Sequence, residues 1–258
     1  MVDTPTAEVV IPARMDSSRL PGKVLADISG KPMLRHVCER SARARLISSV
    51  SVATDSPEIA EQVRDWGFAV YMTSPDAPSG TSRIASIADK LDADLVVNVQ
   101  GDQPLVEPQL IDDLVECLRG NEKIDIATPI WRIDDPADLA DPSIAKVVVD
   151  LEGRAMYFSR SPVPHVRDAE LLDWPRVAKM YGHYGIYAFK RATLVEFNRA
   201  FPTGPLERAE RLEQIGFLEG GYRIHAVKTD FRQVAVDTPE DLERVRQLVS
   251  SGKKSQDV

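Results

Sequence analysis

Residues 9–25 read VVIPARMDSSRLPGKVL, and this stretch decides the fold that we expect. It starts with an unbroken apolar run, which is typical of a strand buried on both faces. The strand leads into a loop that places Arg14, Arg19 and Lys23 around Gly22. Ligands of open α/β sheets bind beyond the carboxyl ends of the strands, so the loop predicts a local anion site. The chain as a whole is acidic, with a formal net charge of −8.

Strands and helices alternate along the first half of the 258-residue chain. The helix expected from residue 56 has Ser56 as its N-cap and Pro57 at its first position, and Gly67 ends it. Such alternation predicts an α/β fold, with a mostly parallel sheet covered by helices on both faces. Apolar runs predict strands at 49–55, 68–74 and 94–99, and helical spacing predicts helices at 32–44, 56–67, 82–91 and 107–120.

The pattern changes after a further apolar run at 125–133. Residues 145–160 predict a hairpin that turns near Glu152 and Gly153, and a loop rich in proline and charge follows over 161–182. We interpret residues 145–190 as a β-rich insertion in a single domain of residues 1–250, with 251–258 as a flexible tail. The remaining elements expected are a strand at 184–191, helices at 192–200 and 205–219, a strand at 222–229 and a last helix from Thr238.

Composition limits the possible partners. The excess of acidic residues argues against a role driven by overall charge on nucleic acid or on a membrane surface. No apolar run approaches the roughly 18 residues that a membrane helix needs. Cys38 and Cys117 are the only cysteines, and we interpret them as reduced thiols. We therefore expect a cytoplasmic protein.

Three strand ends carry polar or charged side chains that can bind a ligand, and residue types alone allow two interpretations of each. The first loop is either a phosphate site or a solvated surface loop. Asp102 in NVQGDQP follows an apolar strand, so it is either a Mg²⁺ ligand or part of an Asx turn. Asp237 in AVDTP is either a second metal carboxylate or an acid that favours the positive end of a helix.

The order of the motifs resolves these alternatives. IPARMDSSRLPGKVL, SGTSR, NVQGDQPLV, YFSRSPVP, HYGIYAF, LEQ and VDTPEDLERVR together resemble the 3-deoxy-manno-octulosonate (Kdo) cytidylyltransferases over about residues 8–248. The resemblance implies a Rossmann-like nucleotidyltransferase fold, dependence on Mg²⁺, and a homodimer built through the insertion. The expected reaction is CTP + Kdo → CMP-Kdo + pyrophosphate.

The resemblance also implies roles for residues of this chain. It gives Lys23, Asp102 and Asp237 the catalytic roles and makes the two aspartates the metal ligands. The nucleotide would be bound by Arg14, Ser17, Arg19, Lys23, Ser79, Gly80, Thr81, Arg83 and Gln100. The small anionic acceptor would be bound by Arg160, Arg167, His183, Glu213 and Gln214. Two arginines suit a carboxylate, and the other three side chains suit hydroxyl groups, although residue type alone favours a purely structural role for His183 beside Tyr184.

The sequence departs from the family pattern at three positions. Ala77 precedes SGT where the family often has His, Ser82 stands where it commonly has an acid, and Gln103 follows GD where it frequently has Glu. These departures leave a second acceptor open, a compact acid such as phosphonoformate. Two further alternatives belong to other classes, a glycosyltransferase and a nucleotide-binding protein without catalytic activity.

Overall fold

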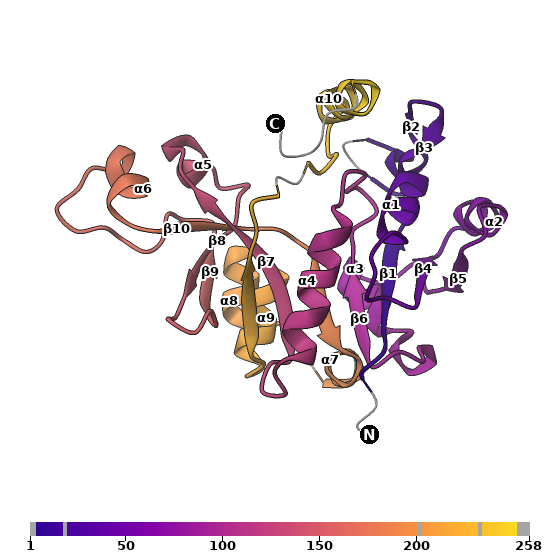
Figure 1. Cartoon of the computed structure of the whole chain (residues 1–258), viewed down its shortest axis with the longest axis horizontal. Coiled ribbons are helices and arrows are strands. Elements are labelled where there is room, and N and C mark those ends of the chain that lie inside the picture. Colours follow the sequence, from indigo (N-terminus) through magenta and orange to yellow (C-terminus); the bar gives the residue numbers. More distant parts are fainter. Residues whose placement is uncertain (1–3, 18–19, 201–202, 232–233, 252–258) are drawn as a thin grey trace.

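The structure is a computed structural model that describes residues 4–17, 20–200, 203–231 and 234–251. Ten strands of the described residues form one sheet in the order β5-β4-β1-β6-β11-β7-β10-β8-β9, and β12 pairs with β7 (Figure 1). The strands are β1 Ala7–Ala13, β4 Ser49–Thr54, β5 Ala69–Met72, β6 Leu95–Asn98, β7 Ile126–Ile133, β8 Lys146–Val149, β9 Ala155–Ser159, β10 Met180–His183, β11 Tyr187–Lys190 and β12 Ile224–Lys228. A separate ribbon pairs β2 (Asp27–Ile28) with β3 (Lys31–Pro32).

The sheet has a parallel part and a mixed part. Strands β5, β4, β1 and β6 run parallel, so their carboxyl ends meet at one edge. Beyond β6, β11 pairs antiparallel with both β6 and β7, and β8 and β9 form the predicted hairpin. Strand β10 overlaps the end of the proline-rich stretch, 161–182, that the sequence predicted as a loop. It pairs antiparallel with β7 along residues 130–133, because the chain from 180 to 190 follows one edge of β7.

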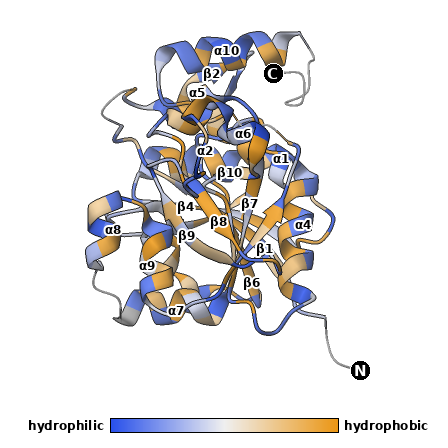
Figure 2. Cartoon of the chain, turned by 90° about the vertical axis from the view of Figure 1, so that its left-hand side faces the viewer, coloured by the Kyte–Doolittle hydropathy of each residue, from blue (hydrophilic) through white to orange (hydrophobic). Residues whose placement is uncertain are grey.

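Helices cover both faces of the sheet, as the sequence predicted (Figure 2). Alternate residues of each strand point to opposite faces, so Val9 and Ile11 pack under α1, α2 and α4, while Val10 packs with α3, α7 and α9. The helices are α1 Met33–Ser41, α2 Pro57–Asp65, α3 Gly80–Ala85, α4 Pro108–Arg119, α5 Pro136–Ala140, α6 Trp174–Val177, α7 Arg191–Ala200, α8 Pro205–Glu210, α9 Glu213–Glu219 and α10 Pro239–Ser250. Short 3₁₀ turns are η1 Lys23–Leu25, η2 Ala88–Lys90 and η3 Leu171–Asp173.

Two predicted helices are interrupted in the structure. The helix expected at 82–91 is divided into α3 and η2, and the Ser86 hydroxyl donates a hydrogen bond to the Arg83 carbonyl where α3 ends. The helix expected at 205–219 is divided into α8 and α9 at Arg211, whose φ of 53° is left-handed. That break turns the chain so that Glu213 and Gln214 begin a new helix.

Helix α10 brings the end of the chain back to its first half. It packs through Leu242 and Val245 on Ile28, Met33 and Leu105. The backbone N–H of Val236 donates to the Asp102 carbonyl at 2.9 Å, which places the start of α10 beside the end of β6. The Thr238 cap predicted from the sequence is confirmed, since Thr238 and Asp241 form a capping box. None of the helices in the described residues has the length and apolar character that a membrane crossing requires.

Candidate functional site

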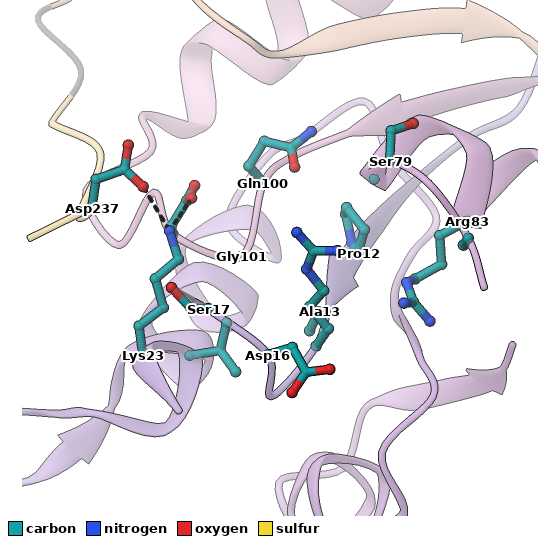
Figure 3. A pocket seen from close by; sticks show the side chains of 15 residues that line it. Pro12, Ala13, Asp16, Ser17, Lys23, Ser79, Arg83, Gln100, Gly101 and Asp237 are labelled. Atoms are coloured by element: carbon teal, nitrogen blue, oxygen red, sulfur yellow. Dashed lines mark hydrogen bonds and ion pairs between the residues drawn. The ribbon is translucent and has the colours of Figure 1, made fainter. Parts of the chain in front are cut away.

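A polar cavity of about 300 Å³ lies where the carboxyl ends of β1 and β6 meet (Figure 3). It is the place that the parallel strands predict for a ligand. Most of the nucleotide residues implied by the resemblance line it. The lining residues of the described chain are Pro12, Ala13, Arg14, Asp16, Ser17, Lys23, Val24, Ala77, Ser79, Gly80, Arg83, Gln100, Gly101, Asp102 and Asp237.

The loop after β1 is folded back on itself. Gly22 adopts a left-handed φ of 68°, which few other residues accept, and its N–H donates to the Met15 carbonyl at 3.1 Å. This turn sends Lys23 into the cavity, where exposed Arg14 and the hydroxyl of Ser17 also lie. The predicted role of Arg19 falls outside the described residues.

Lys23 joins the two predicted metal carboxylates. Its Nζ lies 2.8 Å from Asp102 Oδ2 and 2.9 Å from Asp237 Oδ1, and it also donates to the Val236 carbonyl at 3.1 Å (Figure 3). Burial by itself would lower the pKa of Lys23, but the two carboxylates outweigh burial and raise that pKa. The structure therefore brings together three residues that lie far apart in the sequence.

The SGTSR segment forms one wall of the cavity as the start of α3. Gly80 is required there, because a Cβ at this position would lie 2.9 Å from both Gln100 Oε1 and Pro12 Cγ. The Arg83 side chain is buried. Its guanidinium lies 3.4 Å from Asp55 and donates a hydrogen bond to the Thr73 hydroxyl. Arg83 still lines the cavity, so it contributes a fixed positive charge there.

Glu213 contacts the SGTSR segment and does not line the cavity that contains Lys23. Its carboxylate accepts hydrogen bonds from the hydroxyls of Ser79 and Thr81, the latter at 2.6 Å. Burial raises the pKa of Glu213, and the two hydroxyls oppose that shift. Glu213 and Ser79 also line a second cavity of about 480 Å³, which shares Ala77 and Ser79 with the first.

His183 and Gln214 belong to a second polar cluster in the sheet. His183 Nε2 lies 2.8 Å from the Thr128 hydroxyl, and Gln214 Nε2 lies 3.4 Å from His183 Nδ1. Gln214 Oε1 accepts from the Tyr187 hydroxyl at 3.1 Å. Burial lowers the pKa of His183 to about 3, so the imidazole is neutral at physiological pH.

The two predicted acceptor arginines lie in different settings. The Arg160 guanidinium donates to the backbone carbonyls of Glu210, Arg211 and Pro142 at 2.8–3.1 Å, so it fixes the end of α8 just before Glu213. The Arg167 side chain is 90% exposed and contacts Asp168 at 3.5 Å. The structure thus brings Arg160 near the acceptor residues and leaves Arg167 at the surface, and the acceptor role of both arginines stays a prediction.

Sequence reasoning did not select two buried polar residues that hold the site together. Asn98 on β6 connects Thr81 with Gln100, and Thr128 on β7 contacts His183. Both side chains are 0% exposed. Each stands inside an apolar run, LVVNVQ and DIATPIW, and a polar residue in a buried strand is the signal that could have identified them.

The cavity at the carboxyl edge of the Rossmann-like sheet is lined by Arg14, Lys23 and Arg83 together with Asp16, Asp102 and Asp237, and it defines this chain as an α/β nucleotide-binding protein. A family model described as cytidylyltransferase matches residues 8–224. The chain belongs to this cytidylyltransferase family, and it is a CTP-dependent nucleotidyltransferase. The resemblance noted from the motifs and the fold class are both confirmed.

Individual relatives agree with the family. The 3-deoxy-manno-octulosonate cytidylyltransferase of Geobacter metallireducens is 48% identical over 246 residues, which are 93% of this chain and 96% of that protein. The solved structure of CMP:2-keto-3-deoxy-manno-octonic acid synthetase complexed with CTP covers 96% of this chain and 99% of its own, with a TM-score of 0.89 and 39% identity. A 4-diphosphocytidyl-2C-methyl-D-erythritolsynthase from Anaerococcus prevotii, 13% identical, covers 96% of this chain and 100% of its own with a TM-score of 0.62 and supports the fold alone.

Proposed function

We propose that this chain activates a sugar acid: CTP + Kdo → CMP-Kdo + pyrophosphate. The observation that carries the proposal is Lys23, held between Asp102 and Asp237 in a cavity that Arg14 also lines. A triphosphate needs several cationic contacts, and this cavity supplies them at the edge of the sheet where nucleotides bind. The relatives named for the same reaction support the choice of acceptor.

The anomeric hydroxyl of the acceptor would attack the α-phosphorus, and pyrophosphate would leave with the electrons of the broken P–O bond. Positioning and charge neutralisation provide most of the catalysis in such transfers. Lys23 and Arg14 would hold the leaving phosphates, while Glu213 and Gln214 would orient the hydroxyl groups of the sugar acid. The attacking hydroxyl would release its proton to solvent.

Asp102 and Asp237 fit a divalent metal ion. Both carboxylates reach the same ammonium of Lys23 within 2.9 Å, so both can reach one cation. Mg²⁺ prefers oxygen ligands and commonly binds one or two carboxylates together with substrate phosphates. When bound there, the metal would neutralise charge that develops on the phosphates. Among the described residues, no group of three or more His, Cys, Asp and Glu side chains forms an alternative metal site.

The experiment is pyrophosphate release with CTP, Mg²⁺ and one of two acids. We expect robust turnover of Kdo and little of phosphonoformate, because the compact acid lacks the sugar hydroxyl groups that Glu213 and Gln214 would orient. Chelation of the metal with EDTA should abolish turnover, and Asp102→Asn should lower it by orders of magnitude. Turnover of phosphonoformate without turnover of Kdo would overturn the acceptor while leaving the nucleotide chemistry intact.

We further propose a homodimer that works in the cytoplasm, where CTP is available. Strand β9 is the edge of the sheet, and the insertion exposes Met156, Leu172 and Val177 by 61–71%. An open strand edge and exposed apolar side chains are each typical of an interface. Light scattering of the purified chain tests the dimer, and Met156→Lys is expected to weaken it.

A further inference from the structure

A buried line of hydrogen bonds connects the two cavities. Gln100 lines the cavity that contains Lys23, and its Nε2 donates to Asn98 Oδ1 at 3.0 Å. Asn98 Nδ2 in turn donates to the Thr81 hydroxyl at 3.1 Å. That hydroxyl donates to Glu213, which lines the second cavity. Asn98 lies at the centre of this line and is 0% exposed.

The directions of these bonds follow from the number of hydrogens available. Glu213 accepts from two hydroxyls, so the single hydrogen of each hydroxyl is used. The Ser79 oxygen therefore receives the backbone N–H of Ser82, at 3.0 Å, and the Thr81 oxygen needs a donor. The amide nitrogen of Asn98 supplies it, which turns the Asn98 oxygen toward Gln100.

The same reasoning fixes Gln100. Because the Asn98 oxygen only accepts, Gln100 must direct its amide nitrogen toward β6. Its amide oxygen then faces the cavity, beside Gly80 (Figure 3). A ligand group that meets this oxygen must therefore be a hydrogen-bond donor, such as a hydroxyl or an amino group.

We propose that Asn98 is a positioning residue. Its side-chain amide determines which groups donate and which accept hydrogen bonds at both ends of the site. Its oxygen orients Gln100 at the nucleotide end, and its nitrogen keeps the Thr81 hydroxyl directed at Glu213 at the acceptor end. The assignment of these two ends rests on the proposed function. Asn98 reaches the ligands through Gln100 and Glu213, so it acts without touching either substrate.

Two variants separate the two halves of this role. Asn98→Asp keeps an acceptor for Gln100 but removes the donor to Thr81, whose hydroxyl then turns from Glu213 toward the introduced carboxylate. Asn98→Leu is the matched control, because it has a similar size and removes both halves. Loss of a hydrogen bond to a charged group corresponds to about a 10- to 100-fold effect. We therefore expect N98D to raise the KM for Kdo about 10- to 100-fold and to change the KM for CTP little, whereas N98L raises both.

NMR of the Gln100 side-chain amide gives a readout that needs no turnover. In the wild type and in N98D the amide proton that faces residue 98 should exchange slowly with solvent, and in N98L it should exchange fast. Circular dichroism checks that each variant is folded. If the wild type does not use Kdo, the proposed acceptor fails, and Asn98 is still judged by amide exchange and by the affinity for CTP. Fast exchange in the folded wild type, or equal effects of N98D on both KM values, would overturn the proposal.

Discussion

Replacing Lys23 by Met tests whether this ammonium is the shared counter-charge of Asp102 and Asp237. The Met side chain is similar in length but leaves the two carboxylates without the cation that lies 2.8 and 2.9 Å from them. A hydrogen bond to a charged group contributes about 1.5–3 kcal/mol. The two carboxylates are 26% and 43% exposed, so water replaces part of each lost contact. We expect a net loss of about 2 kcal/mol in the free energy of unfolding.

The assay is thermal unfolding without nucleotide, first in EDTA and then in Mg²⁺. For a chain of this size, about 2 kcal/mol corresponds to a melting temperature about 4–8 °C lower in EDTA. Mg²⁺ should raise the melting temperature of K23M more than that of the wild type, because in the variant the ion does not compete with an ammonium for the carboxylates. Turnover of K23M should fall by orders of magnitude at all Mg²⁺ concentrations.

Lys31→Met is the matched control for this experiment. Lys31 forms an ion pair with Glu39 at 2.7 Å, but its side chain is 42% exposed and it does not line the cavity. Exposed pairs contribute about 0–1 kcal/mol, so K31M should leave both the melting temperature and its response to Mg²⁺ nearly unchanged. Equal melting curves for K23M and the wild type in EDTA would refute the counter-charge role.

Three further substitutions test the hydrogen bonds of Glu213, the burial of His183 and the helix cap at Thr238. Glu213→Gln introduces an amide nitrogen that cannot accept a hydrogen bond from a hydroxyl. The KM for Kdo should therefore rise at least about tenfold, while the KM for CTP changes little. Equal changes in both KM values would contradict the acceptor assignment. Because burial lowers the pKa of His183 from 6.5 to about 3, the unfolded chain binds a proton in that window that the folded chain does not. The wild type should then lose up to about 1.4 kcal/mol per pH unit relative to His183→Gln as the pH falls below 6.5, and parallel stability curves in urea would refute this. Thr238→Ala removes a confirmed helix cap and should cost about 1 kcal/mol in urea unfolding, whereas Ser250→Ala at the other end of α10 should cost less.

The parallel half of the fold could be predicted from the sequence because its signals are local. The run from Ala7 to Ala13 is buried at every position, and the carboxyl ends of such strands mark the ligand edge without any knowledge of the rest. Ser56, Pro57 and Gly67 delimit α2 as expected, because caps and stops act within one turn. Local signals therefore sufficed for most elements of this half and for the general position of the site, but not for the division of 82–91 into α3 and η2.

The second half needed contacts that no local pattern contains. The break between α8 and α9 lies at Arg211, where no glycine marks the left-handed residue. The Arg160 guanidinium, 51 residues away, donates to its carbonyl at 3.1 Å. Strand β10 forms in a proline-rich stretch because β7 offers it an edge. In both places tertiary contacts outweigh local propensity, so the sequence alone could not reveal them.

Some residues of the candidate site could likewise be predicted from the sequence and others could not. The difference follows from the kind of interaction that each residue makes. Lys23, Asp102 and Asp237 carry charges, and charged residues at strand ends and loops are conspicuous in a sequence. Their meeting still depends on α10, which returns the chain to β6 through the contact between Val236 and Asp102. The segment around each aspartate does not by itself distinguish a metal ligand from an Asx turn or an acid at a helix start.

The predicted acceptor residues His183 and Gln214 depend on the direction of their hydrogen bonds rather than on charge. His183 is neutral, and the Thr128 hydroxyl has one hydrogen, which the Ile186 carbonyl accepts at 2.7 Å. Thr128 must then accept from His183 Nε2, which leaves Nδ1 as the acceptor for Gln214. Since the Ile186 carbonyl can only accept, this one backbone group determines which atom donates in each of these hydrogen bonds. The directions of these hydrogen bonds are set only when the strands are paired in the folded sheet. For this reason residue type alone allowed His183 two roles, whereas in the folded protein its imidazole is neutral.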